Sequence, residues 1–178
     1  GSPKRFMSFY NTTFRNNTVI MLPTNASINS ASIVLEGGTG TFVDNYFVTA
    51  NYYGELYYFG SNGDGTFTTG SLIDDVGTRS WGVCMGDFDN VGDLDVVSGD
   101  GGGGALYYLE KTGTGNSFAT KVQIGTITAN SYIMDMAAGD YDNDGNIDFI
   151  LTGYNSNFYF FKGLGNGQFT STTLTVGT

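Results

Sequence analysis

Histidine is absent from the 178 residues of this chain, and cysteine occurs once. Without histidine, the chain cannot use histidine-based acid-base catalysis, a Ser-His-Asp triad or a histidine-ligated metal site. Cys84 has no second cysteine with which to form an intrachain disulfide. It lies in the mainly apolar run of residues 81–85, where we expect a buried and unreactive thiol.

Helix-forming residues are also few, and proline occurs only 2 times. Alanine, glutamate and lysine are sparse, whereas 28 glycines, 14 phenylalanines and 12 tyrosines stand beside many threonines and asparagines. This composition favours short strands joined by tight turns. We therefore expect an almost all-β chain.

Long apolar runs are missing as well. No stretch approaches the roughly 20 residues of a membrane-spanning helix, and no secretory signal is visible. Gly1-Ser2 resembles a cloning remnant, so we expect the natural N-terminus to lie beyond this sequence. The sequons at Asn11, Asn16 and Asn25 would accept N-glycans if the protein is secreted through a glycosylating pathway.

Positive charge is scarce, because 7 lysine and arginine residues face 17 aspartate and glutamate residues, for a net charge of -10. No basic stripe is present, so we do not expect nucleic-acid binding. The acidic residues are concentrated: eight of the fourteen aspartates lie within residues 87–95 and 140–148. This clustering indicates metal sites more than a generally acidic surface.

Residues 140–148 read Asp-Tyr-Asp-Asn-Asp-Gly-Asn-Ile-Asp, with carboxylates at the first, third, fifth and ninth places. Carboxylates this close repel one another unless a cation lies between them, and hard oxygen ligands suit Ca²⁺. An EF-hand would need flanking helices and a glutamate at the twelfth place, which is Leu151. Residues 147–152 are mostly β-branched, aromatic or aliphatic, so we expect the loop to join two strands.

Glycine marks an internal repeat, because Gly37, Gly86 and Gly139 begin three similar runs that lie 49 and 53 residues apart. Each run continues with a strand, an aromatic strand, a glycine-containing turn and a final strand. The final strands are expected at residues 67–73, 118–124 and 169–176. Four strands per repeat near this period are typical of β-propeller blades, each of which is a four-stranded antiparallel sheet.

The repeat predicts three complete blades and one partial N-terminal blade. Residues 5–22 resemble the third and fourth strands of a unit. The units are a partial blade with its connection, a blade with a degenerate loop, and two blades with acidic loops: residues 3–30, 31–80, 81–130 and 131–178. A closed ring takes roughly four to eight blades. The chain is therefore part of a larger propeller, an arc closed by a second copy, or a small ring with an irregular blade.

An acidic loop followed by an aromatic strand and a Gly-rich turn to Phe resembles the FG-GAP/VCBS repeat. Such repeats build the β-propellers of integrin α subunits and of many secreted microbial proteins and lectins. The resemblance covers about residues 31–178. It implies that Ca²⁺ is held between the first and second strands of a blade, on one face of the disc, and that partners dock on the opposite face.

Carried onto this chain, the resemblance implies two structural Ca²⁺ sites. In the first complete blade only Asp44 remains of the loop pattern, so we expect that blade to hold no metal. In the loop at residues 140–148, Asn146 would supply its carbonyl oxygen. The side-chain ligands implied there are Asp140, Asp142, Asp144 and Asp148.

The loop at residues 87–95 departs from the family pattern at one place. Val91 stands where the fifth-place carboxylate belongs, so we expect weaker binding than in the other loop. The ligands that the resemblance implies here are the side chains of Asp87, Asp89 and Asp95 and the carbonyl oxygen of Asp93.

A ligand surface is expected at the other end of the blades, in the loops between second and third strands and between blades. Aromatic rings beside polar groups suit a sugar, because the ring covers its flat apolar face and the polar groups bind its hydroxyls. The alternative is that Trp81 and several tyrosines are simply core between blades. The residues assigned to this surface are Tyr52, Tyr53, Arg79, Trp81, Asp100, Tyr132 and Tyr154.

These expectations lead to a non-catalytic, calcium-stabilised β-propeller module, extracellular or at the cell surface, for adhesion or recognition of a protein or glycan ligand. Two other classes stay open: the propeller body of a secreted carbohydrate-active enzyme, and a structural subunit that self-associates or takes further blades from a parent chain. The chain has the glutamates Glu36, Glu55 and Glu110, and nothing in the sequence pairs them for glycosidase chemistry.

Overall fold

The computed structural model describes residues 14–15, 42–43, 46–62, 64, 66–78, 80–127, 132–154 and 158–174. Within these ranges every regular element is a β-strand, which confirms the predicted all-β class. No helix with the length and apolarity needed to cross a membrane occurs there. The strands are β1 (Phe14–Arg15), β2 (Phe42–Val43), β3 (Tyr46–Ala50), β4 (Glu55–Gly60), β5 (Ser71–Asp75), β6 (Val83–Gly86), β7 (Asp95–Gly99), β8 (Ala105–Leu109), β9 (Val122–Thr126), β10 (Ile133–Gly139), β11 (Asp148–Gly153), β12 (Phe158–Gly163) and β13 (Phe169–Leu174).

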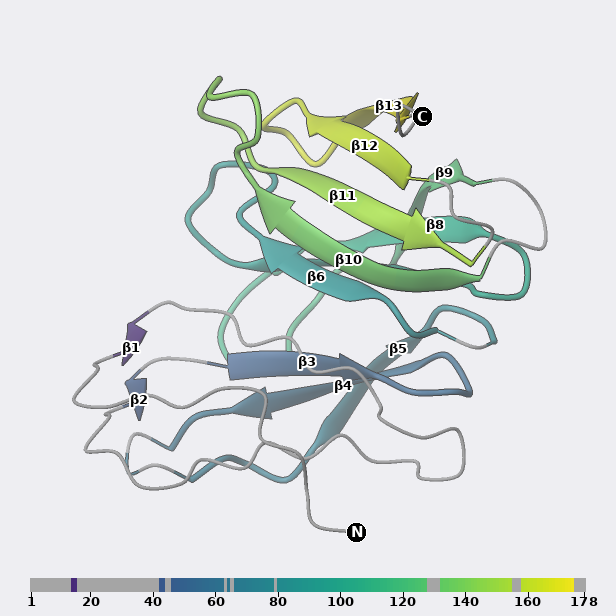
Figure 1. The fold of residues 1–178 in the computed structure, drawn as a ribbon. Helices are drawn as coiled ribbons and strands as arrows, with labels where there is room; N and C mark the ends of the chain where they lie inside the picture. Colours follow the sequence, from purple (N-terminus) through teal and green to yellow (C-terminus); the bar gives the residue numbers. More distant parts are fainter. Residues whose placement is uncertain are drawn as a thin grey trace, which may run out of the picture.

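Three antiparallel sheets contain most of these strands, in the orders β3-β4-β5, β6-β7-β8-β9 and β10-β11-β12-β13 (Figure 1). We call them the first, middle and last sheets. Neighbouring strands are consecutive in the chain and antiparallel, as expected for strands joined by short connections. The middle and last sheets have the predicted four strands. The expected first strand of the first sheet, before residue 46, lies outside the described residues.

The N-terminal partial unit falls mostly outside the described residues. Of this unit, the structure describes β1, which pairs in parallel with β2 through Phe14 and Phe42. The three sequons lie outside the described ranges as well.

The fourth strands of the first and middle sheets begin later than the sequence predicts. After each glycine turn the chain makes one isolated bridge, at Phe67 or Phe118, and regular pairing resumes only at Ser71 and Val122. Both sheets also carry a register shift between the third and fourth strands, which displaces the ladder. In the last sheet, pairing starts at Phe169 as predicted.

The sheets stack in chain order, with β6 beside both β3 and β10 (Figure 1). Alternate residues of each strand point to opposite faces, so the middle sheet contributes to two cores. Val83, Met85 and Val96 pack toward the first sheet. Aromatic residues dominate the other core, in which the rings of Phe149 and Phe161 stack at 4.5 Å with an interplanar angle of 5°.

Glycines allow the middle and last sheets to approach closely. Ile133 of β10 is fully buried and lies over Gly82 and Gly99. A Cβ atom at Gly99 would lie 2.1 Å from Cδ1 of Ile133, and one at Gly82 would lie 2.7 Å from its Cγ2. The isoleucine therefore fills space that the missing glycine side chains leave open.

Two positions that are buried in the middle sheet are more exposed on the outer face of the last sheet. Strand pairing places Phe158 and Phe160 at the positions of Leu106 and Tyr108. Leu106 is 0% exposed and Tyr108 is 6% exposed beneath the last sheet, whereas Phe158 is 39% exposed and Phe160 is half-buried. The last sheet therefore presents an apolar face of the kind that a neighbouring sheet covers elsewhere in the molecule.

Cys84 lies in β6 and is 0% exposed, as predicted. Burial raises the pKa of its thiol well above the ordinary value, so the reactive thiolate form is suppressed.

The contact between the two glycines and Ile133 predicts a large effect of truncation. Ile133→Ala should lower the free energy of unfolding by about 2–5 kcal/mol, because the sheets cannot close over the resulting cavity. Urea denaturation would measure this change. Val122→Ala is a control, since Val122 is 58% exposed and exposed substitutions change stability by about 0.5 kcal/mol or less. Equal losses in the two variants would contradict the packing described here.

Candidate metal centre

Two acidic loops have the same backbone conformation. The first acidic loop, residues 87–94, joins β6 to β7, and the second, residues 140–147, joins β10 to β11. Their fourth residues, Asn90 and Asn143, have φ of 63° and 60°. Their sixth residues, both glycine, have φ of 98° and 89°. Asparagine and glycine tolerate this left-handed region, so the shared sequence pattern produces the same turn twice.

The ninth-place aspartate of the second loop is a buried anchor. Asp148 is 0% exposed. Its Oδ2 accepts the Tyr141 N–H at 2.9 Å, and its Oδ1 accepts the Gly163 N–H at 2.9 Å. A buried carboxylate requires such donors. The bonds fix the loop to both β11 and the end of β12.

Asp95 anchors the first loop in the same way. It is 0% exposed and accepts the N–H groups of Phe88 at 3.2 Å and Lys111 at 2.8 Å. It also accepts the Tyr108 hydroxyl at 2.9 Å. Burial raises the pKa of Asp95 to about 6, although the hydrogen bonds act in the opposite direction.

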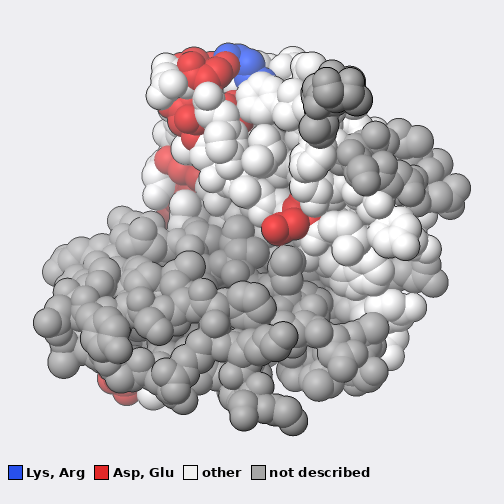
Figure 2. Space-filling model, in the orientation of Figure 1, with Lys and Arg blue, Asp and Glu red and all other residues white. Residues whose placement is uncertain are grey.

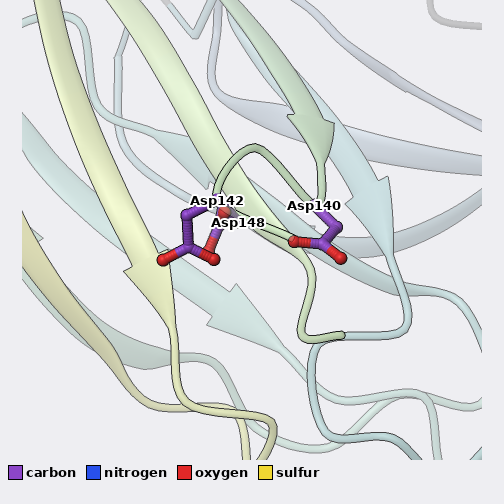
Figure 3. A group of neighbouring side chains, drawn as sticks. All are labelled: Asp140, Asp142 and Asp148. Atoms are coloured by element: carbon purple, nitrogen blue, oxygen red, sulfur yellow. The ribbon is translucent and has the colours of Figure 1, made fainter. Parts of the chain in front are cut away.

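Three carboxylates of the second loop gather at its base. One carboxylate oxygen from each of Asp140, Asp142 and Asp148 lies within 4.8 Å of the other two (Figure 3). Backbone N–H groups of the loop also point at these acids, since Asp140 accepts from Asp144 at 3.1 Å and from Gly145 at 3.0 Å. In the part of the chain that the structure describes, this is the acidic group that meets the spacing of a metal site.

Asp144 has a different set of partners. One of its oxygens accepts the Asn146 N–H at 2.9 Å, and the other lies 2.6 Å from Nζ of Lys162. Lys162 also forms an ion pair with Asp142. The hydrogen bond from Lys162 lowers the pKa of Asp144, and the two carboxylates raise the pKa of Lys162. The sequence did not reveal this role of Lys162, because the lysine is remote from the loop along the chain.

The carboxylates of the first loop are less closely grouped than those of the second loop. Asp87 Oδ2 accepts the Gly92 N–H at 3.1 Å, and Asp89 accepts the Val91 N–H at 3.2 Å. Asp93 is exposed. The other oxygen of Asp87 is buried and has no hydrogen-bond partner among the described residues. An unpaired buried carboxylate oxygen is costly unless a cation binds it, so the donor set fits a hard divalent ion.

The two loops touch, so the acids form one surface. Asn90 Nδ2 donates to Asn146 Oδ1 at 2.9 Å. The glycine turn after β12 also reaches the first loop, because Gly167 N donates to the Phe88 carbonyl at 3.0 Å. Figure 2 shows Asp and Glu side chains along the upper left edge, with Lys or Arg side chains among them at the top.

The first sheet lacks the buried anchor. Tyr46 stands at the ninth place, where the other loops have Asp95 and Asp148. Its hydroxyl donates to the Leu94 carbonyl of the neighbouring loop, and burial raises its pKa. Asp44 lies outside the described residues, so the expectation that this blade holds no metal stays a prediction.

Aromatic residues gather at the opposite ends of the strands. The ring centroids of Trp81 and Tyr132 are 5.4 Å apart, and those of Tyr132 and Tyr154 are 5.9 Å apart. Trp81 and Tyr132 precede the first strands of their sheets, and Tyr154 follows a second strand. Trp81 is half-buried and Tyr154 is 66% exposed. The row therefore runs from a partly buried ring to a well-exposed one.

The remaining residues assigned to this surface differ in role. Tyr52 and Tyr53 are exposed in the β3–β4 turn, with ring centroids 5.7 Å apart. Asp100 accepts N–H groups from Thr78 at 3.0 Å and from its own turn, including Gly102 at 2.8 Å. These bonds assign Asp100 a structural role in holding the β7–β8 turn. Arg79 lies outside the described residues.

The raised pKa of Asp95 predicts a pH dependence of stability. Its carboxyl ionises at about 6 in the folded state and near 3.8 in the unfolded state. Between these values the folded state binds the extra proton, so stability falls as the pH rises through this range. In EDTA, the melting temperature of wild-type protein should therefore fall more between about pH 4 and about pH 6 than that of the Asp95→Asn variant. Equal pH profiles would contradict the assignment.

Comparison with known proteins addresses the predicted repeat. Residues 87–151 match the family model of the FG-GAP-like repeat. A stretch of 94 residues, 51% of this chain, is 30% identical to "Cartilage acidic protein 1" of Xenopus tropicalis and spans 14% of that protein. The family match contains both acidic loops and the strands β7, β8, β9 and β10. The predicted resemblance to FG-GAP/VCBS repeats is thus confirmed over residues 87–151.

Proposed function

We propose that the chain is a calcium-stabilised, non-catalytic β-propeller module of an extracellular protein, and that it recognises a protein or glycan ligand. The observation that carries this proposal is the pair of acidic loops with one backbone conformation, side by side at one edge of consecutive sheets. The FG-GAP-like match over both loops supports it.

The oxygen donors favour calcium over softer metals. Three carboxylates within 4.8 Å of one another would repel without a cation, and the buried Asp87 oxygen has no other partner among the described residues. Bound Ca²⁺ would supply positive charge to these acids and so stabilise the two strand connections. Extracellular modules hold Ca²⁺ with a Kd of about 10⁻⁴–10⁻³ M, which suits such partly exposed loops.

The stacking of sheets supports the propeller arrangement. Each sheet packs on the next in chain order, as blades do. The apolar outer face of the last sheet, with Phe158 and Phe160, would be covered by a further sheet of a parent chain or by a second copy. This face also favours the second candidate function, a subunit that assembles through its sheets.

The position of the aromatic row supports recognition. Trp81, Tyr132 and Tyr154 lie at the strand ends away from the acidic loops. A row of rings that ends in an exposed tyrosine offers a flat apolar surface for a sugar or for an apolar side chain.

The two described glutamates lie at opposite ends of the sheets. Glu55 begins β4 at the aromatic end of the sheets and accepts a hydrogen bond from Asn51. Glu110 follows β8 at the acidic-loop end. The two therefore cannot form the carboxylate pair of a glycosidase, whose groups are about 5–10 Å apart. Glu36 lies outside the described residues.

Calcium should raise the thermal stability of the protein. At a Ca²⁺ concentration of roughly 100 times Kd, each site would add about 2.7 kcal/mol, or a melting temperature several degrees higher than in EDTA. Asp140→Ala plus Asp142→Ala should remove roughly half of the increase, and Asp87→Ala plus Asp89→Ala a similar part. Calorimetric melting in EDTA and in Ca²⁺ would measure both.

A charge-matched control separates binding from net charge. Asp64→Asn plus Asp135→Asn removes two charges outside the acidic loops and should keep the full calcium response. If wild-type protein melts at the same temperature with and without Ca²⁺, the calcium proposal fails.

The aromatic row predicts a loss of ligand binding without a loss of fold. Tyr154→Ala should abolish binding on a glycan array, since stacking on an exposed ring supplies much of the affinity for a sugar. The melting temperature should change little. Leu164→Ala is a control, because Leu164 is 44% exposed and lies in the turn beside the acidic loops. If wild-type protein binds glycans and the Tyr154→Ala variant binds them equally well, the ligand binds elsewhere.

A further inference from the structure

The ammonium of Lys162 lies where the second acidic loop gathers its negative charge. Its Nζ is 2.6 Å from Oδ2 of Asp144 and forms a second ion pair with Oδ2 of Asp142. Asp142 is also one of the three gathered carboxylates. The lysine therefore engages a carboxylate that a bound divalent ion would need.

The backbone beside Lys162 is held at the loop. Lys162 is the last residue but one of β12, and the next N–H, from Gly163, donates to the buried Asp148. A Cβ atom at Gly163 would lie 2.1 Å from the Ile147 carbonyl oxygen, which shows how closely the strand approaches the loop. The lysine side chain is 36% exposed and leaves β12 directly beside the acids.

The first acidic loop has the opposite charge at the same place. Strand pairing puts Glu110 of the middle sheet at the position of Lys162. The following residue confirms the correspondence, because Lys111 and Gly163 donate equivalent N–H groups to the ninth-place aspartates. The Lys111 ammonium interacts electrostatically with Asp93, but it binds the Gly113 carbonyl and forms no ion pair with the described acids of the first loop.

The two loops differ in the acid that pairs with Lys162 as well as in the lysine itself. The fifth place is Asp144 in the second loop and Val91 in the first. Val91 is 67% exposed. One loop therefore has an extra carboxylate with a lysine beside it, and the other has neither. Counting carboxylates alone overestimates how strongly the second loop attracts a cation.

We infer that Lys162 is a tethered cation that competes with Ca²⁺ for the second acidic loop and stabilises that loop in the absence of metal. The inference rests on the proposed calcium binding. It opposes the ranking of calcium affinities expected from the sequence, because the loop with more carboxylates also has a lysine that competes for them. It also places one positive charge between Asp142 and Asp144, since Lys162 forms an ion pair with each.

Removing the charge of Lys162 tests the competition. The Asp87→Ala plus Asp89→Ala protein, in which the first loop is disabled, serves as the reference. Adding Lys162→Met to it should tighten Ca²⁺ binding roughly threefold to tenfold, as measured by isothermal titration calorimetry. The single variant should melt at a lower temperature than wild-type protein in EDTA, and this difference should vanish or reverse in saturating Ca²⁺.

Lys121→Met provides the matched control. Lys121 forms its ion pair with Asp74 at 2.6 Å, away from the acidic loops. Its loss should lower the melting temperature equally with and without Ca²⁺ and leave calcium affinity unchanged. The reciprocal variant, Glu110→Lys, should weaken calcium binding by the first loop.

The outcomes distinguish the two proposals. Wild-type protein that binds no Ca²⁺ by calorimetry or melting would overturn the proposed function, and this inference with it. Wild-type protein that binds Ca²⁺ while Lys162→Met has the same affinity, and melts lower in both conditions, would overturn the inference alone.

Discussion

The acidic edge depends on carboxylates that are buried and bound by backbone N–H groups. Asp95 and Asp148 are 0% exposed, and each joins its loop to the third strand of its sheet. An ionised group in such a place would cost several kcal/mol without these donors. The anchor therefore selects one loop conformation. That conformation brings Asp140 and Asp142 close to Asp148.

Close packing between sheets brings the two anchored loops together. Ile133 lies over Gly82 and Gly99, so the middle and last sheets approach more closely than two ordinary side-chain layers would allow. At the edge, this approach puts Asn90 and Asn146 within 2.9 Å. The acidic surface is therefore a product of both levels of structure, the local turn and the stacking of sheets.

The sequence was sufficient for features that depend on neighbouring residues. The acidic loops, their flanking strands and the buried Cys84 follow from local spacing and from a repeat of recognisable residues. Features that depend on register between distant segments were beyond it. Lys162 meets Asp142 only through strand pairing, and the role of Asp100 depends on which N–H groups its turn presents. The late starts of β5 and β9, and the register shifts within their ladders, leave no mark in the sequence.

Tyr46 makes the first sheet depend on its neighbour. The other two loops are held by an aspartate within their own sheet, whereas the Tyr46 hydroxyl bonds to the Leu94 carbonyl of the middle sheet. The middle sheet thus holds its own loop without the first sheet, whereas the first sheet relies on a carbonyl group of its neighbour. Loss of the first sheet would leave both acidic-loop anchors in place, and local opening of the middle sheet would remove the partner of Tyr46.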